Sequence, residues 1–194
     1  MLFDEYKQKV IDVTSVSEGL EFDTRVQWPG TRYSRVQVKS ICSADSVVRL
    51  PERRLNRYGQ IVNVATVTAN VLCANPNMTD LILPPKFSFI SDGMLAGCGK
   101  LKRMTFPKSI SHIRKNTFMD CTALEDIYYE GTQKEWDKID VDFYIDKHNI
   151  DWSGGLHCKV TTVRYPELGN EPLRHARIHF DCDLVGCYAS GSGD

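Results

Sequence analysis

Residues 101–124 read LKRMTFPKSISHIRKNTFMDCTAL, and residues 78–101 before them read MTDLILPPKFSFISDGMLAGCGKL. Offset by 23 residues, the two stretches carry apolar residues, a proline and a cysteine at equivalent positions. The pairs are Met78 and Leu101, Leu81 and Met104, Leu83 and Phe106, Pro84 and Pro107, Phe87 and Ile110, Ile90 and Ile113, Leu95 and Phe118, and Cys98 and Cys121. Such a fixed period predicts a solenoid, in which each coil buries its apolar side against the next.

Each repeat opens with an alternating segment, as in 101–106, which predicts a short strand. Pro107 ends that strand because proline has no N–H to donate to a sheet. The later apolar positions are three to five residues apart, which favours tight turns over a long helix. One coil is therefore predicted to be a strand, a corner and a tight return.

The array is short. Val64, Val67 and Leu72 fit the pattern weakly, and residues 124–129 repeat its strand once more. The predicted units are a degenerate coil at 55–77, two regular coils at 78–100 and 101–123, and the closing strand at 124–129. Solenoids need about three repeats to bury enough surface, so both ends are expected to be capped.

A short helix is predicted to cap the C-terminal end of the array. Thr132 and Glu135 have the spacing of a capping box, in which each satisfies a free backbone N–H at the start of a helix. Trp136 and Ile139 are three residues apart, so both can lie over the last coil.

The flanking segments are expected to be β-rich. Leu2, Phe3, Tyr6 and Val10 share one helical face, which predicts a short docking helix, and alternating residues 25–28 and 35–38 flank a Pro-Gly turn. Residues 156–163 and 176–182 read as strands joined by a turn within 166–172, before a Gly/Ser tail. The predicted fold is mainly β with short helices. Its segments are an N-terminal helix and β-rich cap (1–54), a solenoid with a closing helix (55–139) and a C-terminal segment with a β-hairpin (140–194).

Composition narrows the classes of partner. The chain has 194 residues, 42% of them hydrophobic and 25% charged, and a net charge of −1. The electrostatic basis for binding nucleic acid or an anionic membrane surface is therefore missing. The first ten residues do not resemble a signal peptide, and the seven cysteines include no C-x-x-C pair. The expectation is a chain that is cytoplasmic at synthesis, with reduced thiols.

One candidate binding site lies on the strand face that points away from the core. Residues at the same position of successive repeats line up across the predicted sheet. One such row carries alternating charges, and the adjacent row carries a mixed set that includes an aromatic residue. This strand-face strip consists of Asp80, Arg103, Asp126, Ile82, Thr105 and Tyr128, with Lys102 and Glu125 at its edges. It is predicted to be either a recognition surface or a solvated ion-pair ladder that keeps the coils in register.

Other clusters resemble ligand sites only superficially. His175, His179, Cys182 and Cys187 are the only grouped soft ligands, but His179 and Cys182 would point to opposite faces of a strand. Residues 93–101 resemble a phosphate-binding loop, but the glycine spacing is wrong and Leu101 replaces the required Ser or Thr. Four aspartates lack the glycine and glutamate offsets of a calcium loop and favour a solvated acidic loop; they are Asp140, Asp142, Asp146 and Asp151. No catalytic site, metal site or cofactor is predicted.

The repeat pattern, together with the ending IYYEGTQKEW at 127–136, closely resembles the bacterial BspA-like type of leucine-rich repeat. The resemblance covers about a third of the chain. It implies a right-handed solenoid with a short parallel sheet and a role in protein recognition, often at cell surfaces. Family members commonly carry many repeats and a secretion signal, and neither is seen here.

Two functions fit these observations. The first is a non-enzymatic protein–protein interaction module that presents a leucine-rich-repeat surface. The second is a structural subunit of a larger multi-copy assembly, such as a phage virion, with the repeat as a docking or decoration element. Both predict a protein partner or neighbouring subunits and membership of an oligomer or complex.

Overall fold

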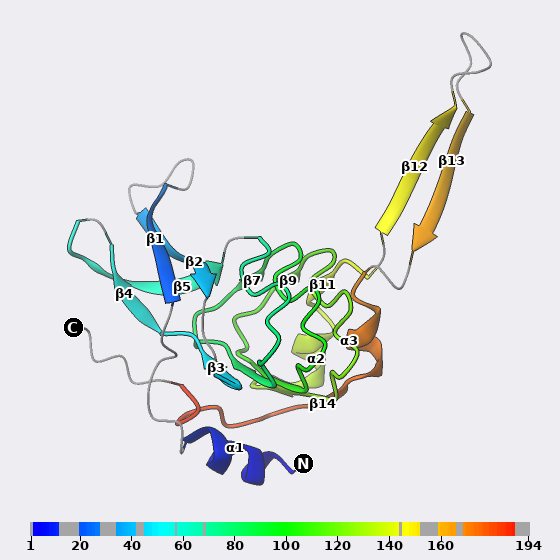
Figure 1. Cartoon of the computed structure of the whole chain (residues 1–194). Helices are drawn as coiled ribbons and strands as arrows, with labels where there is room; N and C mark the ends of the chain where they lie inside the picture. Colours follow the sequence, from blue (N-terminus) through cyan, green and yellow to red (C-terminus); the bar gives the residue numbers. More distant parts are fainter. Residues whose placement is uncertain are drawn as a thin grey trace.

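The structure is a computed structural model that describes residues 2–11, 20–27, 34–41, 45–56, 58–67, 69–143, 145–151, 159–165 and 169–188. It is mainly β with short helices (Figure 1). Its centre is a stack of coils that carry two parallel sheets; further strands lie at both ends of the stack, and the N-terminal helix lies along one side of it.

The larger sheet of the stack has five parallel strands in the order β14-β10-β8-β6-β3. They are β3 (Val47–Arg49), β6 (Asp80–Ile82), β8 (Arg103–Phe106), β10 (Asp126–Tyr129) and β14 (Arg177–His179). Leu81 pairs with Met104 and Met104 with Ile127, which confirms the 23-residue offset. The alternating segments form the strands that the sequence predicts.

The second sheet lies on the return path of each coil. Its parallel strands are β7 (Phe89–Ile90), β9 (His112–Ile113) and β11 (Asp140–Val141), in the order β11-β9-β7. The turns that follow are also joined from coil to coil by backbone hydrogen bonds, such as Leu72 N to Met94 O (3.1 Å) and Leu95 N to Thr117 O (3.1 Å). Each coil is thus tied to its neighbours on both sheets and at the turns between them.

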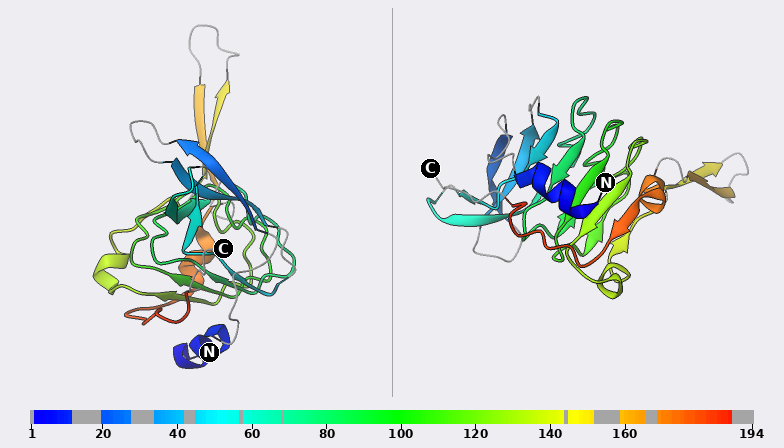
Figure 2. Two further views of the ribbon diagram at one scale, coloured as in Figure 1. Left: turned by 90° about the vertical axis from the view of Figure 1, so that its left-hand side faces the viewer. Right: turned by 90° about the horizontal axis from the view of Figure 1, so that it is seen from below.

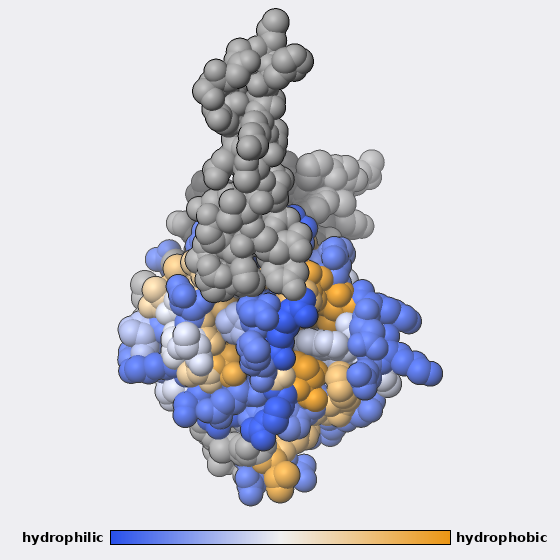
Figure 3. Space-filling view, turned by 90° about the vertical axis from the view of Figure 1, so that its right-hand side faces the viewer, coloured by the Kyte–Doolittle hydropathy of each residue, from blue (hydrophilic) through white to orange (hydrophobic). Residues whose placement is uncertain are grey.

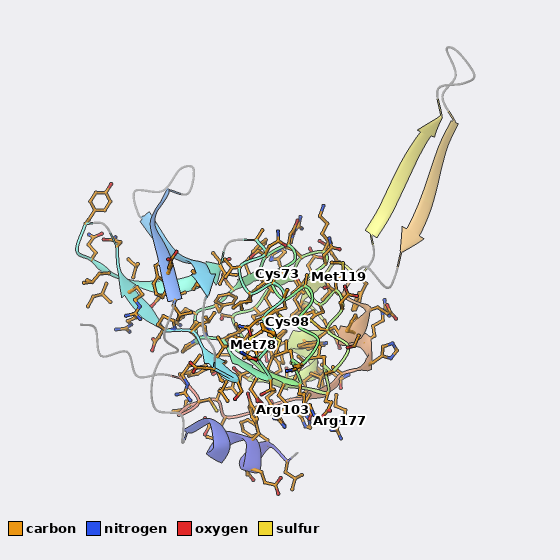
Figure 4. All side chains as sticks on the ribbon, viewed as in Figure 1. Cys73, Met78, Cys98, Arg103, Met119 and Arg177 are labelled. Atoms are coloured by element: carbon orange, nitrogen blue, oxygen red, sulfur yellow. The ribbon has the colours of Figure 1, made fainter. Side chains whose placement is uncertain are left out.

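The core fills the space enclosed by the coils. The repeated apolar positions are all buried, namely Met78, Leu81, Leu83, Phe87, Ile90, Leu95, Leu101, Met104, Phe106, Ile110, Ile113 and Phe118. The thiols of Cys98 and Cys121 donate to the carbonyls of Leu72 (3.1 Å) and Leu95 (3.2 Å) in the preceding coil. Figure 4 shows Cys98 inside the stack. The repeated cysteine is therefore a small core residue that also links two coils.

The N-terminal end of the stack differs from the prediction. Its coil takes its strand from β3, and Val47 pairs with Asp80 at an offset larger than 23. Between β3 and the turn at Leu72 lies an antiparallel pair, β4 (Arg53–Leu55) and β5 (Ile61–Val67). The degenerate coil predicted at 55–77 is therefore wrong in the place of its strand, which is β3, although Val64, Val67 and Leu72 are buried as expected.

The predicted N-terminal hairpin and helix are both present. Strands β1 (Leu20–Gln27) and β2 (Ser34–Ile41) pair antiparallel, and β2 joins β5 in a four-stranded sheet of order β1-β2-β5-β4. Helix α1 (Phe3–Ile11) precedes them and buries Tyr6 completely. Leu2, predicted to share the buried face, is 73% exposed.

The C-terminal segment contains a hairpin, but with different strands from those expected. Strand β13 (Lys159–Tyr165) pairs antiparallel with β12 (Ile145–Asp151), not with residues 176–182. Part of the expected acidic loop therefore forms β11 and β12. Helix α3 (Glu171–His175) takes the place of the expected turn, and β14 after it joins the five-stranded sheet beside β10.

Two sets of hydrogen bonds stabilise the C-terminal end of the stack. Helix α2 (Gln133–Trp136) has the predicted capping box: Glu135 N donates to Thr132 Oγ1 (3.3 Å) and Thr132 N to Glu135 Oε2 (2.8 Å). Before α3, the buried Asn170 accepts a bond from Phe118 N (3.0 Å) and donates to the carbonyls of Arg114 (2.7 Å) and Asp142 (2.6 Å). Among the helices in the described part of the chain, none has the length and hydrophobicity of a membrane-spanning segment.

Candidate functional site

The strand-face strip lies on the outer face of the five-stranded sheet, as the alternation predicts. The sheet register aligns one column as Val47, Asp80, Arg103, Asp126 and Arg177, and a second as Arg49, Ile82, Thr105, Tyr128 and His179. Strands β3 and β14, which fall outside the expected 55–139 segment, thus extend both columns. The six predicted strip residues are brought together on one face.

The charged column contains two bidentate ion pairs. Arg103 binds Asp80 through Nε to Oδ1 (2.6 Å) and Nη2 to Oδ2 (3.3 Å), and Thr79 Oγ1 donates to Asp80 Oδ2 (2.6 Å). Arg177 binds Asp126 in the same way at 3.0 and 3.4 Å. Figure 4 shows Arg103 and Arg177 on the side of the stack where α1 lies.

The prediction that this face is solvated is wrong. Asp80, Ile82, Thr105, Asp126 and Tyr128 all have 0% exposure, and the Arg103 side chain retains 12%. Two segments from opposite ends of the chain cover the strip: α1 and residues 180–188 (Figure 2). Together with strip residues they form an apolar cluster of Tyr6, Val47, Ile82, Tyr128, Cys182, Leu184 and Cys187, with Phe3 and Tyr188 packed against it.

Aromatic rings connect α1 to the sheet. The Tyr128 ring stacks on Tyr6 with centroids 4.3 Å apart and an interplanar angle of 19°, and on His179 at 4.8 Å and 25°. Phe3 lies at 5.3 Å from Tyr128, and the Arg103 guanidinium lies 5.8 Å from the centroid of the Tyr6 ring. Tyr128 is thus the middle ring of a three-ring stack that crosses from helix to sheet.

The electrostatics of the strip follow from this burial. Burial raises the pKa of Tyr128 to about 12, and the pKa of Tyr6 is raised well above its ordinary value, also mainly by burial. The hydrogen bond with Asp80 raises the pKa of Arg103, which keeps the guanidinium charged. His179 Nε2 lies 2.9 Å from Asp126 Oδ1, so an imidazole N–H can complete the shell of that carboxylate.

The edge residues are more exposed than the strip itself. Lys102 Nζ lies 3.8 Å from Glu125 Oε1, and both side chains are about half exposed. Lys7 Nζ on α1 lies 2.8 Å from Asp183 Oδ2 in the C-terminal segment, which joins the two covering segments at the surface.

The remaining clusters singled out in the sequence were not predicted to be ligand sites. Among the described residues, no group of three or more His, Cys, Asp and Glu side chains converges on a metal position. Cys182 donates to the backbone carbonyl of His179, and Cys187 is buried in the apolar cluster. Asp140 and Asp142 lie beside His112 (4.0 Å) and Arg114 (3.6 Å). In the phosphate-loop look-alike, Leu95 and Cys98 are core residues.

A second candidate surface is the C-terminal end of the stack. Trp136 packs against Phe106, Tyr129 and Phe180 with centroids 5.8, 5.3 and 6.5 Å apart, which confirms that it covers the last coil. Beside it is an open hollow of about 350 Å³ between α2, β11, α3 and β14. Its apolar lining consists of Trp136, Ile139, Val141, Phe143, Leu173, Ala176 and Ile178. Figure 3 shows hydrophobic patches between hydrophilic side chains at this end.

Residues 61–143 match the family model described as a BspA type leucine-rich repeat region. This part of the chain is therefore a BspA-type leucine-rich repeat region. Leucine-rich repeats generally mediate protein interactions and are usually non-enzymatic. No curated protein matches the chain significantly.

Three solved bacterial leucine-rich repeat proteins are similar over 59% of this chain. A T. pallidum protein is 18% identical, is covered over 52% of its length and has a TM-score of 0.48. A Bacteroides ovatus protein is 18% identical, with 31% covered and a TM-score of 0.48. A Bacteroides capillosus protein is 17% identical, with 81% covered and a TM-score of 0.49. The chain spans about half the length of the T. pallidum protein.

The residues that sequence reasoning missed are those that cover the strip. Tyr6 was expected on a docking helix, but nothing in the pattern indicated which surface it contacts. Leu184 and Cys187 lie in a segment without clear periodicity. The one usable signal was the alternation of Arg177, Ile178 and His179, which matches the alternation of the repeat strands.

Proposed function

We propose that the chain is a non-enzymatic protein–protein interaction module built on its BspA-type leucine-rich repeat region. The observation that supports this most is the regular ladder of parallel strands, in which equivalent side chains recur at each coil. Such an array holds side chains at fixed spacing, which suits recognition of another protein. On the larger sheet these side chains lie under α1 and residues 180–188, so a partner reaches them only where that cover moves aside. A right-handed coil, as the family resemblance implies, is part of the proposal.

Affinity capture on the immobilised chain tests this function. A cell lysate is passed over it, and bound proteins are eluted with excess free chain. We expect saturable retention of a defined protein that the free chain competes away. In parallel, a panel of hydrolase, transferase and redox assays should show no turnover. Turnover that rises in proportion to the purified chain would contradict the proposal.

A second candidate function is a structural subunit of a multi-copy assembly, such as a virion. The observation in its favour is the two-stranded ribbon of β12 and β13, paired at seven positions from Ile145 with Tyr165 to Asp151 with Lys159. In Figure 1 the ribbon projects away from the coils, and among the described strands it has no further sheet partner. An isolated two-stranded hairpin is at best marginally stable in water, so in this candidate function a neighbouring subunit supplies the missing support.

Light scattering and hydrogen exchange at several protein concentrations test this candidate. An assembly subunit should show a mass that rises with concentration, together with growing protection of amides in 145–151. A monomeric mass at every concentration, with unchanged rapid exchange in the ribbon, would exclude it.

A further inference from the structure

Helix α1 and the C-terminal segment are attached to the strip in different ways. The C-terminal segment is fixed by backbone hydrogen bonds, from Asp181 N to Gly131 O (3.0 Å) and from Cys182 N to Tyr129 O (3.0 Å). The contacts described for α1 are made by side chains: the stacked Tyr6, the tilted Phe3 and the surface pair of Lys7 with Asp183. A helix held in this way can leave without breaking a sheet.

The fit of α1 to the strip is incomplete. Tyr6 is fully buried, yet its hydroxyl has no hydrogen-bond partner in the part of the chain that the structure describes. A buried hydroxyl that is not hydrogen-bonded costs free energy, because its bonds to water are lost and not replaced. A phenylalanine at the same place would keep the ring stack on Tyr128 and avoid this cost.

We propose that the strand-face strip is a binding surface for an amphipathic helix, that α1 occupies it as an intramolecular ligand of less than optimal fit, and that a partner helix displaces α1. This inference rests on the proposed interaction function and names its site and partner. The partner helix carries two aromatic residues three positions apart, the second being phenylalanine, followed directly by a basic residue.

The chemistry of this partner is taken from the contacts of α1. Phe3 and Tyr6 are three positions apart, so they lie on one face of a helix and both reach Tyr128. The guanidinium of Arg103 favours an aromatic ring at the second position. Asp183, whose pKa is lowered chiefly by its hydrogen bond with Lys7, favours a cation at the next position. A wholly aliphatic helix would lack all three of these contacts, and a helix with an acidic residue in place of Lys7 would place like charges beside Asp183.

The test uses the full chain and a fluorescein-labelled peptide of residues 2–11 that carries Tyr6→Phe. Binding is measured by fluorescence anisotropy to the wild-type chain and to the Tyr6→Ala chain, in which α1 has lost its stacking ring. Because α1 competes for the strand-face strip, the apparent affinity of the peptide scales with the fraction of molecules in which α1 is detached. We expect binding to the Tyr6→Ala chain at least ~10-fold tighter than to wild type.

Matched controls separate docking from folding. The Leu2→Ala chain alters an exposed residue of the same segment and should behave as wild type. A peptide with both aromatic residues changed to alanine should bind no chain. If the Tyr6→Ala chain does not fold, Lys7→Glu replaces it, since it changes an exposed contact and places like charges beside Asp183.

Hydrogen exchange decides the outcome. In the Tyr6→Ala chain, or in the Lys7→Glu chain that replaces it, backbone amides of residues 3–11 should exchange freely while those of β6, β8 and β10 stay protected. The proposal is overturned if the peptide does not bind a chain with this exchange pattern, if it binds all chains equally, or if neither variant detaches α1. A partner still captured by the wild-type chain would then leave the interaction function intact at another surface. Enzymatic turnover by the purified chain would contradict the proposed interaction function, but it would not change the interpretation of the peptide binding.

Discussion

Arg103→Ala should be among the most destabilising single changes on the outer face of the sheet. Its partner Asp80 is fully buried, and Arg103 donates two hydrogen bonds to the Asp80 carboxylate, at 2.6 and 3.3 Å. Removing one member of a buried ion pair leaves an uncompensated charge and costs about 3–5 kcal/mol. Because Thr79 still donates to Asp80, we expect a loss at the lower end, about 3 kcal/mol. Domains of this kind are stable by only ~5–15 kcal/mol.

Urea denaturation followed by circular dichroism measures this loss. The set comprises wild type, Arg103→Ala, Asp80→Ala and the double variant, so that the coupling between the two residues can be extracted. The double variant should be less destabilised than the sum of the two single changes, because it leaves no unpaired carboxylate. Lys102→Ala is the matched control: its pair with Glu125 is half exposed, so its cost should be below about 1 kcal/mol.

A loss within about 1 kcal/mol for Arg103→Ala, equal to that of the control, would refute this reasoning. Such a result would mean that Asp80 is solvated and that α1 and residues 180–188 do not cover the strip. The sequence alone predicts that smaller loss, so the measurement separates the two interpretations.

Four further predictions concern the coils and the helix that covers the last of them. Trp136→Ala should lower the free energy of unfolding by less than the ~3–5 kcal/mol of a fully buried aromatic, because the indole is only partly buried; urea melts measure this, and a larger loss would contradict it. Burial raises the pKa of Cys98 to about 11 and of Cys121 to about 12, so at pH 8 a thiol reagent should label the exposed Cys73 quickly and these two only on unfolding. Since their protonated forms are favoured in the folded state, thermal stability should hold below pH 9 and decline from about pH 9 towards 12, and a flat profile would contradict this. Gly93→Ala should cost more than about 1 kcal/mol in urea melts, because φ is +62° and an added Cβ would collide with the side chain of Asn70; an unchanged midpoint would show that the turn relaxes.

The repeat could be predicted from sequence because its period fixes geometry. Equal spacing of apolar residues requires equal coils, and the register of Leu81, Met104 and Ile127 follows directly. The capping box is similarly local, since Thr132 and Glu135 need only each other. The N-terminal coil could not be placed, because residues 50–60 interrupt the period between Val47 and Val64.

The state of the outer face could not be predicted, because alternation assigns a side chain to a face but does not say what lies on it. Asp80 and Tyr128 have the pattern of exposed strand residues, and only the fold brings α1 and the C-terminal segment over them. The strand pairing of 140–194 was missed for the same reason. Strand β14 joins a sheet formed by residues far before it, so no local signal marks its partner.

Proton–proton NOE spectroscopy on the full chain, with the tyrosine rings assigned, tests the central claim most directly. If α1 is docked on the strip, ring protons of Tyr6 and Tyr128 should give strong cross-peaks, since their centroids are 4.3 Å apart. Tyr128 should also show cross-peaks to His179, at 4.8 Å. Cross-peaks between Tyr128 and His179 without any to Tyr6, together with a Tyr6 ring at its random-coil shifts, would contradict the account and show the strip to be open.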